Sequence, residues 1–243
     1  MPNRLGSSLL HPAATITAAL AMMLTVMLAS AASARPANSL VYPPTAHPFG
    51  NSYTEWSEEW WEWALSLPVE GHPFTDSFVC NGANNGQAGR VWFLGLSASP
   101  PQLERSCIIP AHTAILIGLA NVECSSLEPE FPDGTGGQTA ATQRECAKAF
   151  ADEIVVSSLF CIVDGEPVEN IGSFRFPSSQ FTFTAPTPWI FGATGGTGTA
   201  VSDGFYLMFK PLSRGTHTLS CGGAFGGPLF QAEFANTYHL TVE

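Results

Sequence analysis

Residues 53–68, YTEWSEEWWEWALSLP, form the most distinctive stretch of this sequence. Ser52 and Glu55 have the spacing of a capping box, and neither Gly nor Pro interrupts the run before Pro68. The pattern therefore predicts a helix from Tyr53 to Leu67. Large apolar side chains recur at the i, i+4, i+7 and i+11 spacing of one helical face: Trp56, Trp60, Trp63 and Leu67.

Two roles are open to these tryptophans. Three indoles on one face can attach the helix to a sheet, because each buries about 150–250 Å². Alternatively, indole faces can stack on sugar rings while neighbouring carboxylates carry out acid–base chemistry. We favour attachment to a sheet. Trp61 lies off the stripe, so we expect it to be the exposed indole and take it as the candidate binding residue.

Beyond the helix the chain has the character of short β-strands separated by turns that contain Gly and Pro. Apolar or alternating runs of strand length occur at 90–96, 114–119, 205–209, 216–221 and 237–242. These patterns predict a mainly β fold: an antiparallel β-sandwich, jelly-roll or Ig-like, with the Trp-rich helix at its N-terminal side. One inserted helix is expected from about Ala140 to Val155. We expect residues 35–50 to be an extended lead-in and 51–243 to be a single domain.

The first 34 residues have the layout of a secretory signal peptide. Arg4 precedes an apolar run over residues 13–28, and residues 32–34, Ala-Ser-Ala, fit a cleavage site. An uncleaved membrane anchor is the alternative, but the run is short and ends in small residues. We therefore expect a secreted protein, extracellular or periplasmic, with no membrane span after cleavage.

Composition excludes two further classes of protein. Hydrophobic residues make up 45% of the chain and charged residues only 12%, which is the opposite of an intrinsically disordered sequence. The formal net charge is -11. Residues 1–34 hold one of the nine basic residues and no acidic one, so the remainder carries 8 − 20 = −12. Because a phosphate backbone requires a basic surface, no nucleic-acid partner is expected.

All six cysteines lie beyond the signal segment, and an even number in an exported chain is typical of disulfides. A zinc site is disfavoured because no pair has C-x2-C spacing. Six cysteines allow 15 pairings, which sequence alone does not choose among. The expected elements favour three pairs. These are Cys80–Cys107 around the first strand, Cys124–Cys146 across a loop, and Cys161–Cys221 on two alternating strands.

Motifs for catalysis are missing from the sequence. It contains no G-x-S-x-G, no phosphate-binding G-x-x-x-x-G-K-[ST] and no H-E-x-x-H. Carboxylates are the remaining candidates, since two of them can carry out glycoside hydrolysis. Glu58 or Glu62 of the helix, facing Glu123, would make such a pair.

Metal binding is not expected either. Glu128, Glu130 and Asp133 form an acidic loop with oxygen ligands suited to Ca²⁺, but their spacing matches no defined site and we prefer a solvated turn. His217 and His239 fall on opposite faces of adjacent strands, so they should not share a metal. We expect His217 to pack or form a hydrogen bond at a strand start, and we expect no cofactor.

Several segments resemble a family of exported prokaryotic proteins of unknown function. The family shows a Trp-rich "EW..WWQW..S.P" element, a "G.VWFL" strand and an "R.C.VPAGKA" strand, which are similar to residues 50–68, 86–97 and 105–124. The likeness continues to the C-terminus and implies export and a single domain, but no reaction. The chain departs at His112 and Thr113, where the family usually has Gly-Lys, so a ligand role of that lysine would not carry over.

Three functional hypotheses follow. The surplus of aromatic residues and the missing motifs favour a non-catalytic binding module for a glycan or an envelope protein. A secreted hydrolase that acts on polysaccharide through a carboxylate pair is the alternative. A purely structural component of the cell envelope is the third.

Overall fold

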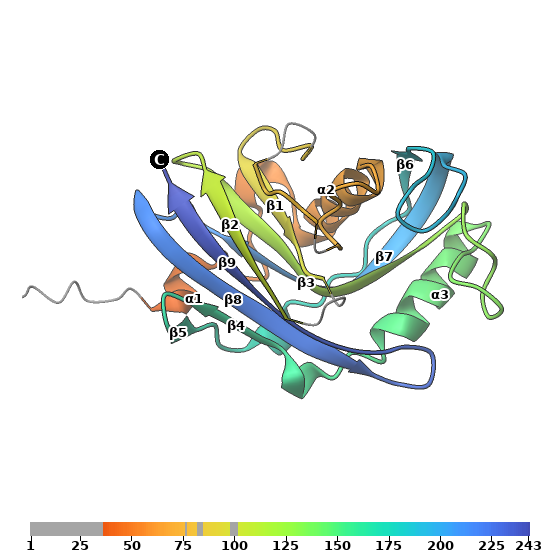
Figure 1. Cartoon of the computed structure of the whole chain (residues 1–243). Coiled ribbons are helices and arrows are strands. Elements are labelled where there is room, and N and C mark those ends of the chain that lie inside the picture. The colour runs from red at the N-terminus through yellow and green to blue at the C-terminus, as the bar shows by residue number, and fades with distance from the viewer. Residues whose placement is uncertain (1–35, 76, 82–84, 98–101) are drawn as a thin grey trace, which may run out of the picture. The chain divides into compact units, whose positions relative to one another are not determined.

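Two β-sheets pack against each other around one hydrophobic core (Figure 1). The computed structural model describes residues 36–75, 77–81, 85–97 and 102–243. The predicted signal peptide, residues 1–34, lies outside the described residues. The chain divides after Ser33 into two units, and every described residue belongs to the second.

The first sheet has the strand order β1-β3-β7-β6 and the second the order β2-β9-β8-β4-β5. The strands of the first are β1 (Val91–Gly95), β3 (Ala114–Ser125), β7 (Gly196–Phe209) and β6 (Phe181–Ala185). Those of the second are β2 (Gln102–Ile109), β9 (Gln231–Val242), β8 (Gly215–Gly226), β4 (Phe160–Val163) and β5 (Glu166–Pro167). The helices are α1 (Ala37–Leu40), α2 (Tyr53–Ser66) and α3 (Ala140–Ala151), with 3-10 turns η1 (Pro48–Gly50), η2 (Val156–Ser158) and η3 (Ile171–Ser173).

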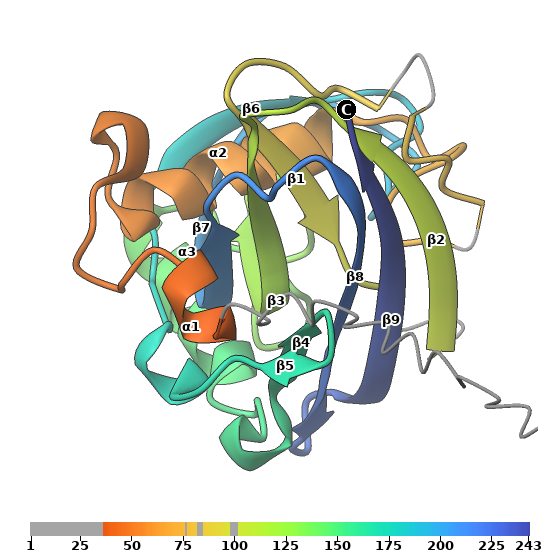
Figure 2. The ribbon, with the colours of Figure 1, turned by 90° about the vertical axis from the view of Figure 1, so that its left-hand side faces the viewer.

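The predicted mainly β sandwich is confirmed, but each sheet is mixed rather than wholly antiparallel. The parallel pairs are β1–β3 and β2–β9. Between β1 and β3 the chain crosses to the other sheet, where it forms β2, and it therefore re-enters the first sheet in the direction of β1 (Figure 2). The remaining strand pairs are antiparallel.

The predicted Trp-rich helix is α2, and it packs on the first sheet. The capping box of Ser52 and Glu55 is formed. The indoles that the periodicity placed on one face are buried, with Trp60 only 1% exposed, and the Trp60 N–H donates to the Leu94 carbonyl over 3.0 Å. Close approach of helix and sheet depends on Gly118, because a Cβ atom there would lie 2.6 Å from the Trp60 ring. The tryptophans therefore join the helix to the sheet, as we favoured.

The inserted helix is α3, and it is shorter than predicted. It ends at Ala151 rather than near Val155. The reason is pairing with the second sheet: Ile154 forms an isolated bridge with Phe225, and the Val155 N–H donates to the Ala224 carbonyl. Strand pairing at these positions replaces the last turn of the expected helix.

All three predicted disulfides are present: Cys80–Cys107, Cys124–Cys146 and Cys161–Cys221. The expected extended lead-in differs from the structure, since α1 and η1 interrupt it, and Val41 after α1 bridges to Phe209 at the end of β7. Among the described helices, none is long and apolar enough to cross a membrane.

Candidate ligand-binding cavity

The strands that form the two sheets do not end together, and this opens a cavity. Strand β1 pairs with β3 only as far as Gly95 and Gly118, and β2 pairs with β9 only from Ala235 onward. Residues 119–125 of β3 therefore lie beyond β1, while Phe234 and the hairpin before it lie beyond β2. A cavity of about 400 Å³ lies along this part of β3, between α2, α3 and the β8–β9 hairpin. That volume is within the range of sites for small molecules.

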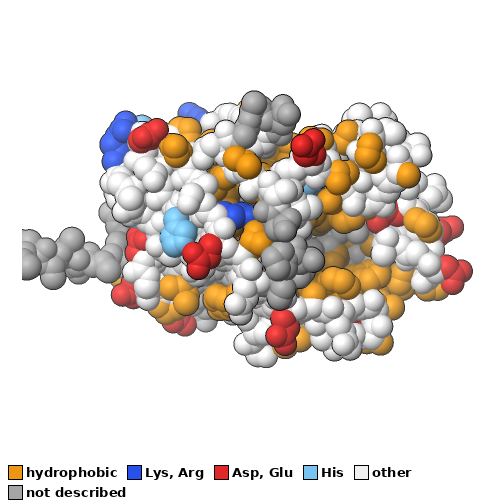
Figure 3. All heavy atoms as spheres, viewed as in Figure 1, with side chains coloured by type: hydrophobic (Ala, Val, Ile, Leu, Met, Phe, Trp, Pro, Cys, Tyr) orange, Lys and Arg blue, Asp and Glu red, His pale blue; other side chains and the backbone are white. Residues whose placement is uncertain are grey.

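Aromatic side chains make up nearly half of the residues that line the cavity. They come from α2, the segment after it, α3, the loop before β7 and the β8–β9 hairpin: Trp60, Trp61, Phe74, Phe150, Phe191, Phe225, Phe230 and Phe234. Phe191 and Phe230 are 44% and 42% exposed, so they lie at the mouth. Figure 3 shows hydrophobic side chains gathered on the right-hand half of this face.

Glu123 is the polar group that distinguishes the cavity. Neighbouring residues of a strand point to opposite faces, and Cys124 is bonded to Cys146 of α3. The Glu123 side chain therefore points to the other face, toward α2, where it lines the cavity together with Trp60 and Trp61. Its side chain is buried, and within the described part of the chain neither carboxyl oxygen has a hydrogen-bond partner.

Burial is the main reason that the pKa of Glu123 lies well above its usual value, because a low-dielectric site disfavours the charged form. The neighbouring Glu128 carboxyl adds to the shift. The two groups are close enough to interact, although no hydrogen bond of acceptable geometry joins them. At a given pH Glu123 therefore holds its proton more strongly than an exposed glutamate does.

Glu128 is held firmly, in contrast to Glu123. One of its oxygens accepts hydrogen bonds from the Ser125 N–H (3.2 Å) and hydroxyl (2.9 Å), and the other accepts one from the Thr135 hydroxyl (2.7 Å). These donors fix the loop that follows β3. Two acidic groups therefore lie side by side at the cavity wall. Both oxygens of Glu128 accept hydrogen bonds, whereas those of Glu123 have no partner among the described residues.

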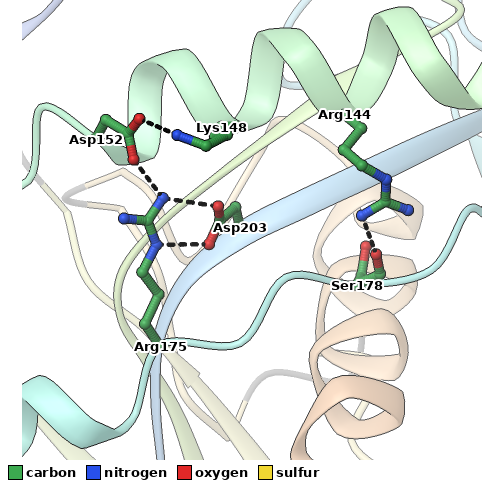
Figure 4. A network of polar contacts seen from close by, with 6 residues as sticks. All are labelled: Arg144, Lys148, Asp152, Arg175, Ser178 and Asp203. Carbon is green, nitrogen blue, oxygen red and sulfur yellow. Dashed lines mark hydrogen bonds and ion pairs between the residues drawn. The ribbon is translucent and has the colours of Figure 1, made fainter.

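Basic side chains nearby are paired elsewhere. Arg175 donates to both oxygens of Asp203, over 2.9 and 2.8 Å, and to Asp152 over 2.8 Å, and Lys148 also pairs with Asp152 (Figure 4). These acceptors hold the pKa of Arg175 above its usual range. Asp203 follows Ser202, the residue that pairs with Glu123, so its side chain lies on the opposite face of β7.

The predicted carboxylate pair between α2 and Glu123 is not formed. Glu58 and Glu62 line an open groove on the other side of α2, together with Glu55 and Glu59, and Glu58 accepts a hydrogen bond from the Ser179 N–H (2.8 Å). Residues four apart on a helix share a face, so the buried indoles direct these glutamates outward. The acidic group next to Glu123 is instead Glu128, a residue for which the sequence suggested only a role in a Ca²⁺ loop.

The expected exposure of Trp61 is wrong. The side chain is 3% exposed, and its N–H donates to the Tyr206 hydroxyl over 2.9 Å. Burial also raises the pKa of Tyr206. The segment after α2 covers both Trp60 and Trp61 with Phe74, whose ring centroid lies 5.9 Å from the ring centroid of each indole. Trp61 therefore contributes to a cavity wall and not to an exposed stacking surface.

The acidic loop does not gather its three carboxylates. Glu128 is buried and bound to Ser125 and Thr135, whereas Glu130 and Asp133 are exposed. No group of three metal-ligating side chains occurs among the described residues. His217 forms a hydrogen bond to Asp164 over 2.7 Å, as expected for a strand start. His239 lies near Glu104 at 3.2 Å, separate from His217.

One signal in the sequence pointed to the cavity. Strand β3 is apolar from Ala114 onward but carries Asn121 and Glu123 at alternating positions, so both fall on one face and both line the cavity. A polar pair on an otherwise buried strand is the pattern that marks a functional site. No protein-family model matches the chain, and searches of curated proteins and of solved structures find no similar protein.

Proposed function

We propose that this chain is an exported binding protein that holds a small, largely apolar molecule in the cavity, with a polar group of that molecule against Glu123. One observation carries the proposal: a buried carboxyl group with no hydrogen-bond partner among the described residues lines a cavity whose other walls are largely apolar and rich in aromatic rings. A buried polar group without a partner is costly, and a ligand that completes its hydrogen bonds recovers that cost.

Export is supported by the three disulfides, which persist in an oxidising compartment outside the cytoplasm. Resemblance to exported prokaryotic proteins supports the same location. Glycan binding by the tryptophans of α2 has less support, because all four indoles are at least nine-tenths buried.

The hydrolase hypothesis loses its carboxylate pair. Glu58 and Glu62 line a different groove from Glu123. The pair that does exist has one carboxylate, Glu128, whose oxygens are occupied by Ser125 and Thr135. A role in binding fits this geometry better than a role in acid–base catalysis.

A neutral hydrophobic fluorophore tests the proposal. N-phenyl-1-naphthylamine should bind the purified protein with enhanced emission and should quench tryptophan fluorescence, since Trp60 and Trp61 line the cavity. Phe230→Ala should weaken binding several-fold because Phe230 forms part of the mouth. Phe160→Ala is the matched control, since Phe160 is similarly exposed at 37% but does not line the cavity.

Absence of binding by the wild-type protein would refute the proposal. Equal weakening by both substitutions would refute the location in the cavity. Either result would favour an envelope glycan or protein as the partner, or a structural role, since those functions place no molecule in the cavity.

A further inference from the structure

The charges around the cavity are of one sign. Glu123 and Glu128 are the ionisable residues among the described residues that line it, and no Lys, Arg or His is among them. Tyr206, below Trp61, is the ionisable group of β7 on the same face, and Arg175 is paired with Asp203 and Asp152 on the other face. The wall therefore offers two acidic groups and no cation to balance them.

The aromatic wall has the same preference. The face of an aromatic ring carries partial negative charge, and cavities built from several such rings recognise ammonium groups. Indole faces are the strongest of these, and Trp60 and Trp61 line the same cavity as Glu123. The net charge of -11 adds a long-range attraction for cations.

An anionic ligand is disfavoured by the same groups. A second negative charge next to two buried acidic groups would be repelled in a medium of low dielectric constant. A neutral ligand would form a hydrogen bond with Glu123, but it would make no use of Glu128 or of the ring faces. A cation makes favourable contacts with all three features.

We infer that the ligand is an organic cation, an ammonium group on an apolar and preferably aromatic body, with the ammonium against Glu123 and the body among the rings of Trp60, Trp61 and Phe230. This inference rests on the proposed function. In the complex the carboxylate of Glu123 forms an ion pair with the ammonium group. Because the cation favours the ionised carboxylate, binding lowers the pKa of Glu123, and the proton that the group held passes to solvent.

Three compounds with one skeleton test the inference: 2-naphthylmethylamine, which is a cation at pH 7, neutral 2-naphthylmethanol, and anionic 2-naphthoate. Calorimetric titration in two buffers of different ionisation enthalpy gives the affinity and the number of protons released. We expect the amine to bind at least tenfold more tightly than the alcohol and to release protons as it binds, and the naphthoate to bind most weakly.

Glu123→Gln keeps the shape of the side chain but cannot ionise. It should abolish both the release of protons and the preference for the amine, so that the amine binds no more tightly than the alcohol. Glu166→Gln is the control for net charge, because Glu166 is exposed on β5, away from the lining residues. It should leave all three affinities unchanged.

The outcomes separate the two proposals. If the alcohol binds as tightly as the amine, or if Glu123→Gln does not alter the preference, the cation inference is wrong and the cavity remains a binding site for neutral molecules. If none of the three compounds binds, and N-phenyl-1-naphthylamine does not bind either, the proposed function itself fails.

Discussion

Replacing Glu123 by glutamine should make the protein more stable at neutral pH than the wild type, by an amount that grows with pH. In the unfolded chain a glutamate ionises near pH 4.5. In the folded protein burial and the Glu128 carboxyl raise the pKa of Glu123 well above that value. The stability that Glu123 contributes is therefore fully present below pH 4.5 and is lost as the pH rises toward the folded pKa.

The magnitude follows from one proton. Over each pH unit in which the unfolded chain has ionised and the folded protein has not, the wild type loses about 1.4 kcal/mol of unfolding free energy. Between pH 5 and pH 7 the loss is therefore at most about 2.7 kcal/mol. Glutamine does not titrate, so the difference between variant and wild type should grow with pH within that limit.

Urea unfolding at pH 5, 6 and 7, with the disulfides intact, measures the effect. Groups that do not interact with Glu123 contribute equally to both proteins, so they cancel in the difference between variant and wild type. Glu166→Gln, at an exposed position, is the control for the loss of one acidic group. Parallel curves for the wild type and Glu123→Gln would show that Glu123 ionises normally, and the description of the cavity wall would then be wrong.

Three further outcomes are expected. Burial lowers the pKa of His72 from 6.5 to about 4, so the free energy of unfolding should fall by about 3 kcal/mol as the pH drops from 6.5 to 4. A His72→Gln variant should lack this loss, and NMR titration of the imidazole gives the pKa directly. Arg175→Met should lower the free energy of unfolding by about 2 kcal/mol, measured by urea, because it leaves the Asp203 side chain, only 8% exposed, without its partner. A double variant that also carries Asp203→Asn should recover most of this loss. No recovery would mean that the loss has another cause. Replacing Cys124 and Cys146 together by alanine should lower the free energy of unfolding by about 3 kcal/mol, measured by urea, since the bridge closes a segment with a sequence separation of 22; an unchanged midpoint would contradict this.

Local features of the sequence determined most of the elements. The capping box at Ser52 and the spacing of Trp56, Trp60 and Trp63 predicted α2 and the face that it buries, because a helix repeats every 3.6 residues whatever surrounds it. The β character of the remainder and the three cysteine pairs followed in the same way from alternation, turns and the position of each cysteine on its expected element.

Long-range pairing decided the features that periodicity could not reach. Strands β1 and β2 became parallel edge strands because the chain crosses between the sheets, and α3 ended early because Ile154 pairs with Phe225 of β8. The exposure of Trp61 was mispredicted for a related reason. Trp61 is buried by Phe74 and by Tyr206, which lies 145 residues away in the sequence. A helical pattern identifies the buried face only where neighbouring elements cover a single side of the helix.

Sequence by itself determined a buried strand over residues 114–119, because the run is apolar and of strand length. The structure extends this strand to Ser125, which places Asn121 and Glu123 on one face of it. Only the tertiary structure decided what that carboxyl group meets. The end of β1 at Gly95 exposes this part of β3, the loop after β3 brings Glu128 beside Glu123, and the β8–β9 hairpin completes an aromatic wall. A site assembled from segments more than 100 residues apart has no local spacing to record it, because its geometry comes from the packing of the two sheets.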